Sequence, residues 1–247
     1  WLQAIQAKSG NDLPSVVSVS YGDNEDTVNF DYANRINGEF IKLGARGVSI
    51  MFSSGDGGVA GGQTTQCQGG KFIPTFPAGS PYVTAVGGTS AGDDTFAASL
   101  SSGGFSNYWD RPSYQKDAVS KYFSEAQHLP DPSHYNQTGA GFPDVAAQAE
   151  SFLVTWGGVS IPVDGTSCAA PTFSGVVSLL NDYRLKNGKS TLGYLNPVIY
   201  KYGNQILNDV TGGHNPGCDT DGFFAAPGWD PVTGYGTPNF EKMKQVL

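Results

Sequence analysis

The chain has 247 residues, enough to bury a large hydrophobic core, and its 34 glycines and 15 prolines predict many loops and tight turns rather than a helical bundle. Its 22 acidic residues outnumber 14 basic ones, and a formal net charge of −8 is the wrong sign for neutralising the phosphates of a nucleic acid. No apolar stretch approaches the roughly 20 residues of a membrane span, so we expect neither nucleic acid nor membrane as a partner.

The first part of the chain has the pattern of a strand, a helix and a second strand. Residues 16–21 are rich in valine and end before Gly22, and apolar side chains recur at helical spacing over residues 31–44. A second apolar run covers residues 48–53. A crossover of this size joins parallel strands and places functional sites at their carboxyl ends. We therefore expect a single α/β domain with a mostly parallel sheet flanked by helices.

The rest of the chain alternates loops with fewer regular segments. We expect a third strand at 82–86, an extended loop at 99–107, a surface loop at 110–143 with one short helix near 114–123, a helix at 167–185 and a loop-rich tail at 208–237.

Three cysteines, Cys67, Cys168 and Cys218, allow at most one disulfide. Cys67 and Cys218 lie in glycine-rich sequence, whereas Cys168 begins an apolar helix and is expected to be buried. The sequon at Asn136 would be glycosylated in a secreted protein. With the low charged content of 15%, these features favour secretion or an acidic lysosomal or vacuolar compartment.

Residues 164–171, Asp-Gly-Thr-Ser-Cys-Ala-Ala-Pro, come directly before the predicted helix at 167–185. The hydroxyl of Ser167 would lie near free backbone N–H groups, and the helix dipole would favour negative charge developing beside it. Pro171 is expected among the first helical residues, where its missing N–H costs little. The alternative is a capped helix start with no catalytic role.

This segment resembles the Gly-Thr-Ser-x-x-x-Pro signature of the subtilisin-like clan. Residues 53–58, Ser-Ser-Gly-Asp-Gly-Gly, carry aspartate where subtilisins carry asparagine, and so resemble the sedolisin branch, the serine-carboxyl peptidases. Motifs similar to its tripeptidyl-peptidase-like members also occur at 18–23, 76–89, 103–107 and 227–234. The resemblance implies a subtilisin-like fold, with residues 1–247 forming the C-terminal part of a peptidase catalytic domain.

The resemblance implies that Ser167 is the nucleophile and that Asp56 donates a hydrogen bond to the oxyanion. An ionised carboxylate would repel an oxyanion, so such an enzyme must work in acid or keep this carboxyl group protonated. Peptide substrate contacts are implied for Ser20, Tyr21 and Gly22, beside which the substrate adds as a strand, and for Ser53, Ser54 and Gly55, which wall the pocket for the residue before the scissile bond.

The catalytic base is the part of the pattern that this chain lacks. In sedolisins the base is a glutamate supported by an aspartate four residues later, upstream of the segment that resembles residues 1–22. None of the 22 acids here is followed by another acid at that spacing. The remaining candidates read as surface or loop residues: His128, His134, His214, Asp23, Glu25 and Asp26.

Two explanations follow from the missing pair. The chain is either part of a processed or fragmentary peptidase whose N-terminal fragment supplies the two acids, or a truncated, inactive relative that serves as a binding or structural domain. We favour the first because Ser167 and Asp56 are both present. A plain subtilisin is remote, since its histidine and asparagine are missing.

The resemblance also implies a Ca²⁺ site and a disulfide near the C-terminus. The implied ligands are the carboxylates of Asp209 and Asp230 and the main-chain carbonyls of Val210, Ala226 and Gly228, an oxygen set that suits calcium. The family usually has glycine at position 226, and a carbonyl ligand survives the change unless the backbone needs a positive φ. The alternative is that the aspartates only cap turns. The implied disulfide joins Cys67 to Cys218.

Overall fold

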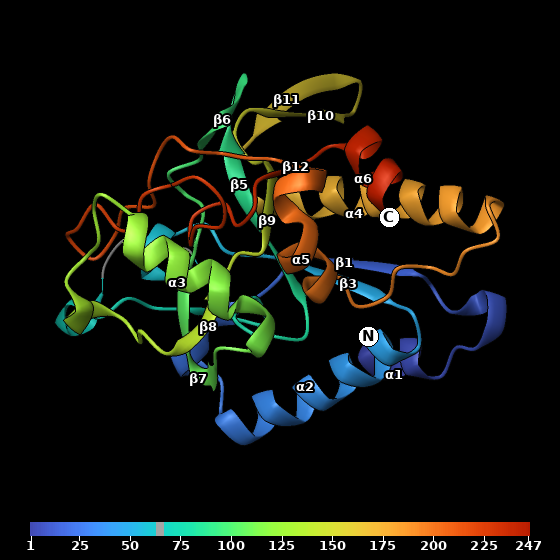
Figure 1. Ribbon diagram of the computed structural model, residues 1–247, viewed down its shortest axis with the longest axis horizontal. Helices are drawn as coiled ribbons and strands as arrows, with labels where there is room; N and C mark the ends of the chain where they lie inside the picture. The colour runs from blue at the N-terminus through green and yellow to red at the C-terminus, as the bar shows by residue number, and fades with distance from the viewer. Residues whose placement is uncertain (63–66) are drawn as a thin grey trace.

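The centre of the protein is a β-sheet with four parallel strands (Figure 1), seen in a computed structural model that describes residues 1–62 and 67–247. β1 (Val16–Val19) pairs with β3 (Ser49–Ser53), which pairs with β5 (Thr84–Ser90), and β9 (Val145–Gln148) pairs with β5. β6 (Asp93–Ala97) adds antiparallel to the end of β5. The expected α/β fold with a mostly parallel sheet is confirmed.

Helices cover both faces of this sheet. The crossover helix α2 (Phe30–Ala45) and helix α4 (Thr166–Lys186) lie on opposite sides of β1 and β3 in Figure 1. β3 is buried on both faces: Ile50 and Phe52 pack in the cluster beneath α2, whereas Met51 packs in the larger cluster beneath α4. This alternation is the period of two that a strand imposes on its side chains.

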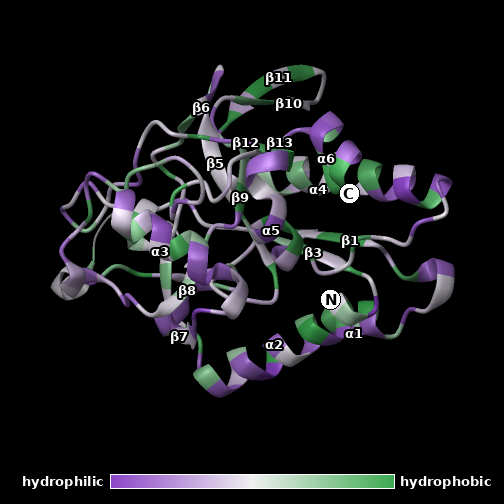
Figure 2. Ribbon diagram, in the orientation of Figure 1, coloured by the Kyte–Doolittle hydropathy of each residue, from purple (hydrophilic) through white to green (hydrophobic). Residues whose placement is uncertain are grey.

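Both helices bury large apolar side chains. α2 buries Phe40 and Leu43, and α4 buries Phe173, Val177 and Leu180. Figure 2 shows hydrophobic colour on β1, paler colour on β5 and mixed colour along α2 and α4. This packing fixes the start of α4 beside the ends of the strands, where the candidate site residues lie.

Shorter elements surround the sheet. They are α1 (Leu2–Gln6), β2 (Asp23–Asn24), β4 (Thr75–Phe76), β7 (Gly104–Asp110), α3 (Lys116–Glu125), β8 (Gly139–Phe142), β10 (Phe152–Trp156), β11 (Val159–Val163), α5 (Asn196–Ile206), β12 (Leu207–Asn208), β13 (Thr237–Pro238) and α6 (Phe240–Val246). Four antiparallel pairs form among them: β2 with β4, β7 with β8, β10 with β11, and β12 with β13.

Several boundaries differ from the expectations. The strand expected at 82–86 is β5, which starts two residues later and extends to Ser90. The surface loop expected at 110–143 contains the fully buried β8, and the loop expected at 99–107 overlaps its partner β7. A Cβ on Gly139 would stand 2.0 Å from the Ser106 carbonyl oxygen, so glycine is present there because two backbones pack closely.

The covalent and topological expectations can also be checked. Cys67 and Cys218 form a disulfide with a Cα–Cα separation of 4.9 Å, as expected. Cys168 is half-buried rather than buried. The tail at 208–237 is loop-rich as expected. Within the part of the chain that the structure describes, no helix combines the length and apolar character needed to cross a bilayer.

Candidate active site

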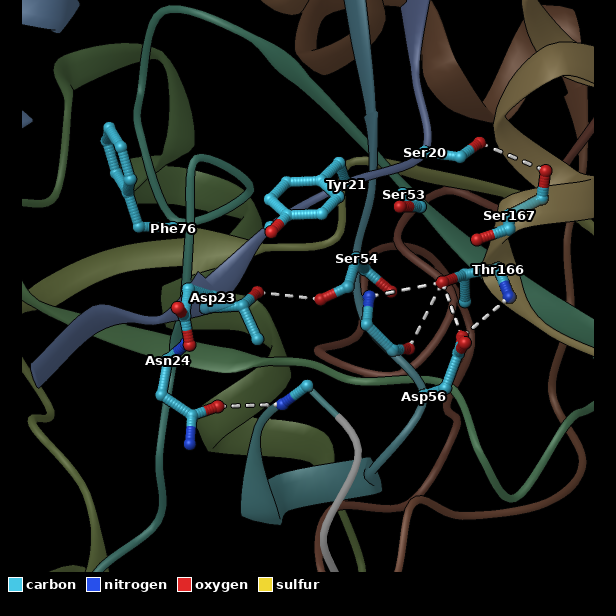
Figure 3. A pocket seen from close by; sticks show the side chains of 14 residues that line it. Ser20, Tyr21, Asp23, Asn24, Ser53, Ser54, Asp56, Phe76, Thr166 and Ser167 are labelled. Carbon is cyan, nitrogen blue, oxygen red and sulfur yellow. Dashed lines mark hydrogen bonds between the residues drawn. The ribbon is translucent and has the colours of Figure 1, made fainter. Parts of the chain in front are cut away.

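A cavity of about 500 Å³ lies where β1 and β3 end and α4 begins. It is lined by all eight residues that the sequence assigned to catalysis or substrate binding: Ser20, Tyr21, Gly22, Ser53, Ser54, Gly55, Asp56 and Ser167. The loops after two neighbouring parallel strands meet the amino end of a helix, as the crossover topology requires. Figure 3 shows their side chains around one space.

Ser167 is the second residue of α4 and is exposed to the cavity (Figure 3). Gly165 precedes the helix with φ +142, and no side chain caps the helix start. A Cβ on Gly165 would lie 3.1 Å from Asp56 Oδ2. Glycine is therefore needed here for its backbone angle and for the close approach of Asp56.

Asp56 is held beside the start of the helix by Thr166. The backbone N–H and the Oγ1 hydroxyl of Thr166 both donate to Asp56 Oδ1, each at 2.7 Å. Thr166 Oγ1 in turn accepts the N–H of Gly55 at 3.1 Å. These bonds hold the Asp56 carboxyl group against Thr166, the residue that directly precedes Ser167. Sequence reasoning assigned no role to Thr166, although its place directly before Ser167 was the available signal.

Pro171 has a different structural effect from the one expected. It is the sixth residue of α4, so it lies beyond the first four positions and its missing N–H removes a helical hydrogen bond to the Ser167 carbonyl. The Ser20 hydroxyl donates to that carbonyl at 3.1 Å instead. Pro171 thus leaves the Ser167 carbonyl free to accept a hydrogen bond from Ser20, which belongs to the segment expected to bind substrate.

Besides Thr166, five further residues line the cavity: Asp23, which the sequence analysis considered only as a loop acid, and Asn24, Gly62, Thr75 and Phe76, which were given no role. Asn24 Oδ1 accepts the N–H of Gly62 at 2.8 Å, and the Gly62 carbonyl accepts the N–H of Asp56 at the same distance. Thr75 Oγ1 donates to the Ser54 carbonyl at 2.6 Å. The pair β2 and β4 therefore supports both the pocket wall and the Asp56 loop.

Of the six candidate bases considered from the sequence, Asp23 lines the cavity and the other five do not. Among the described residues that line the cavity, Asp23 and Asp56 are the carboxylic acids and no histidine is present. Glu25, expected to be a loop acid, is fully buried, and burial raises its pKa to about 7. His134, expected on the surface, is half-buried with its ring stacked on Phe72 at 5.3 Å.

The residues of the expected calcium site lie together in the C-terminal loops. The N–H of Gly228 donates to Asp209 Oδ2 at 2.8 Å, and the N–H of Ala226 donates to Asp230 Oδ2 at 3.1 Å. Burial raises the pKa of Asp209 and that of Asp230, the latter to about 7. Ala226 is not among the residues with positive φ, so alanine can present its carbonyl there.

This donor set fits a hard cation such as Ca²⁺. Within residues 1–62 and 67–247, the structure contains no group of three or more His, Cys, Asp or Glu side chains that could hold a metal ion. Two carboxylates supplemented by main-chain carbonyls remain compatible with calcium, which accepts both kinds of oxygen.

Comparison with known proteins decides the family. Residues 1–195 match the model described as the subtilase family. The chain belongs to the subtilase family. It is 44% identical to the tripeptidyl-peptidase 1 of Homo sapiens over 258 aligned residues, covering 100% of this chain and 45% of that protein, and the protein of the same name from Bos taurus matches equally well. The expected resemblance to tripeptidyl-peptidase-like members is confirmed.

Structural comparison of this subtilase gives the same fold. A structure described as Pseudomonas sedolisin (serine-carboxyl proteinase) superimposes with a TM-score of 0.77 at 24% identity, over 98% of this chain and 66% of that one. The prenylagaramide maturation protease PagA superimposes with a TM-score of 0.55 at 19% identity, over 99% of this chain and 65% of that one. The chain spans less than half the length of the tripeptidyl-peptidases that it matches.

Proposed function

We propose that this subtilase is the C-terminal part of an acid-acting serine-carboxyl peptidase that hydrolyses peptide bonds, as a tripeptidyl-peptidase or an endopeptidase. The observation that carries the proposal is the single cavity in which Ser167, at the start of α4, meets Asp56, at the end of β3. The similarity to tripeptidyl-peptidase 1 supports it.

In this mechanism the Ser167 hydroxyl attacks the carbonyl carbon of the scissile bond. A glutamate from an upstream segment or partner fragment accepts the serine proton, and an aspartate orients that glutamate. The proton then passes to the leaving amine, and water resolves the acyl-enzyme in the second half of the reaction.

Asp56 acts in both halves by donating a hydrogen bond from its protonated carboxyl group to the oxyanion. Thr166 supports this role because it fixes the other carboxyl oxygen, Oδ1, through two hydrogen bonds. The substrate lies beside Ser20, Tyr21 and Gly22, with its side chain before the scissile bond in the pocket walled by residues 53–55. An acidic lysosomal, vacuolar or extracellular setting suits this chemistry.

We further propose that Asp209, Val210, Ala226, Gly228 and Asp230 bind Ca²⁺, which stabilises the C-terminal loops and takes no part in bond cleavage. The cation would offset the charge of two carboxylates in a partly buried loop. The Cys67–Cys218 disulfide connects this region to the segment that follows Asp56. Asn136 is the proposed glycosylation site.

The experiment uses the protein together with the upstream region that carries the acid pair. Ser167→Ala should reduce peptide hydrolysis by roughly 10⁶-fold while circular dichroism stays unchanged, because the nucleophile is removed and the fold is not. Ser160→Ala, on the exposed hairpin, is the matched control and should retain full activity. Hydrolysis that persists in Ser167→Ala would reject the assignment.

The alternative function is that of an inactive binding or structural domain. The natural protein distinguishes this alternative from the peptidase. Intact-mass analysis of the natural protein should find a co-purifying polypeptide that contains Glu-x-x-x-Asp. A natural protein that lacks such a segment and does not cleave peptides in acid would favour the alternative.

A further inference from the structure

Glu25 is a fully buried acid just outside the active-site cavity. It directly follows β2, whose residues Asp23 and Asn24 line the cavity, and its backbone N–H donates to the Pro74 carbonyl at 2.8 Å. Its exposed fraction is 0%. A carboxyl group buried in this way is costly unless its oxygens are hydrogen-bonded, so its partners indicate what it holds in place.

Among the residues that the structure describes, the hydrogen-bond donors to this carboxyl group all come from one strand, β7. The Ser106 hydroxyl donates to Oε1, and the N–H groups of Asn107 and Tyr108 donate to Oε2 at 2.7 and 3.2 Å. Gly79 also lies against the group, because a Cβ there would come within 3.3 Å of Oε1. The side chain of Glu25 therefore joins the segment after β2 to β7 in a tightly packed interior.

One chain of contacts leads from Glu25 to the pocket through Ser106. The Ser106 hydroxyl oxygen also accepts the N–H of Trp109 at 3.1 Å. The ring of Trp109 packs against the ring of Phe76 with 5.7 Å between centroids, and Phe76 lines the cavity. A change at the carboxyl group would thus alter the position of an aromatic ring in the pocket wall.

A second chain of contacts leads to Asp56 through β2. Asp23 and Asn24 pair with Phe76 and Thr75 of β4, and all four line the cavity. The Asn24 side chain holds Gly62, whose carbonyl holds the backbone of Asp56. β2 therefore contacts both the pocket wall and the Gly62 backbone next to Asp56, whose carboxyl group is held separately by Thr166.

We propose that Glu25 is a positioning residue for this pocket, in a role that rests on the proposed peptidase function. By holding β2 and β7 together, its carboxyl group fixes β4, and through the hydrogen bond from Thr75 to the Ser54 carbonyl it fixes the wall at residues 53–55 against which the side chain before the scissile bond packs. Placement of a substrate at a reacting centre is sensitive to shifts of a fraction of an ångström, so a positioning group outside the cavity has a measurable effect.

For this positioning role, residue 25 needs a side-chain oxygen that is far enough from the backbone to accept the N–H groups of Asn107 and Tyr108. Burial raises the pKa of Glu25 to about 7, and the nearby charge of Asp26 raises it further, so the carboxyl group is neutral in acid. The Tyr108 phenol also lies nearby, and the charges of Glu25 and Asp26 contribute to raising its pKa. Glutamine carries a carbonyl oxygen at the same position and can still accept the N–H groups of Asn107 and Tyr108. Methionine has a similar shape and cannot replace these hydrogen bonds.

The test compares Glu25→Met and Glu25→Gln in the protein that also contains the upstream acid pair. Two peptide substrates are used, identical except for a small or a large side chain before the scissile bond. We expect Glu25→Met to raise KM for the large substrate by about 10-fold, with kcat changed less than about threefold and a smaller KM effect on the small substrate. Glu25→Gln should stay within about threefold of wild type for both.

Glu125→Met, at an exposed position on α3, is the matched control and should be neutral. Ser106→Ala is the second variant if Glu25→Met does not fold. It should raise KM for the large substrate by about threefold or more, because it removes the hydroxyl that donates to Glu25 and accepts the N–H groups of Tyr108 and Trp109. Unchanged KM in a folded Glu25→Met, equal rises in KM for both substrates, or a KM of Glu25→Gln as high as that of Glu25→Met would overturn the proposal. Absence of Ser167-dependent hydrolysis in the wild type would instead reject the peptidase function itself, and this inference with it.

Discussion

Asp144 gives the protein a pH-dependent stability whose sign and size follow from burial. Its carboxyl group is fully buried before β9, and Oδ2 accepts the N–H of Ala85 at 2.8 Å. Burial raises its pKa from the ordinary 3.8 to about 7. Between these values the folded protein keeps a proton that the unfolded chain releases, so the free energy of unfolding falls as the pH rises, by up to about 1.4 kcal/mol per pH unit.

Over the whole interval this effect amounts to about 4 kcal/mol, which is a large part of the stability of a typical domain. Asp144→Asn removes the titration while keeping an acceptor for Ala85. We expect the variant to match wild type near pH 4 and to be the more stable protein near pH 7. Urea unfolding at a series of pH values measures this directly.

The control for this experiment is Asp94→Asn, which changes an exposed acid on β6. Its unfolding curve should follow that of wild type at each pH. If wild type and Asp144→Asn lose stability in parallel as the pH rises, the buried carboxyl group is not the source of the effect and the reasoning from burial is wrong.

Two further changes test the backbone of the site and the metal. Gly165→Ala should destabilise the protein by about 1–3 kcal/mol and lower hydrolysis by roughly 10-fold or more, because alanine is strained at φ +142 and its Cβ would press on Asp56. Gly175→Ala, with open space around it, is the control and should change neither stability nor hydrolysis. Equal melting temperatures and activities for the two variants would contradict this reasoning. Bound calcium at 100 times its Kd adds about 2.7 kcal/mol to the free energy of unfolding, which raises Tm by roughly 5–10 °C for a chain of this size. Chelation should therefore lower Tm by that amount, and an unchanged Tm would show that the proposed ligands are wrong.

The sequence predicted the elements whose side chains repeat with a clear period. β1, β3, α2 and α4 have runs of large apolar residues at strand or helix spacing. β9 was missed because Val-Ala-Ala-Gln is short, small and buried, and offers no alternation to read. β8, Gly-Ala-Gly-Phe, was taken for a loop because its glycines reflect close backbone packing rather than a turn.

The cavity residues were predicted as far as motifs identified them. The eight assigned residues lie together because strand ends and a helix start converge in this topology. Thr166 and Glu25 were not assigned because their roles depend on partners far away in the chain, at Asp56 and at Ser106. Such tertiary hydrogen bonds leave no local pattern in a sequence.

The central claim is that Ser167 and a protonated Asp56 act on the same developing negative charge. The most direct test is the pH dependence of kcat/KM for Asp56→Asn from about pH 3 to pH 7, in the protein with its acid pair. The amide donates a hydrogen bond at every pH, so we expect lower activity than wild type in acid together with a flatter profile. A profile that is unchanged in shape would contradict the account.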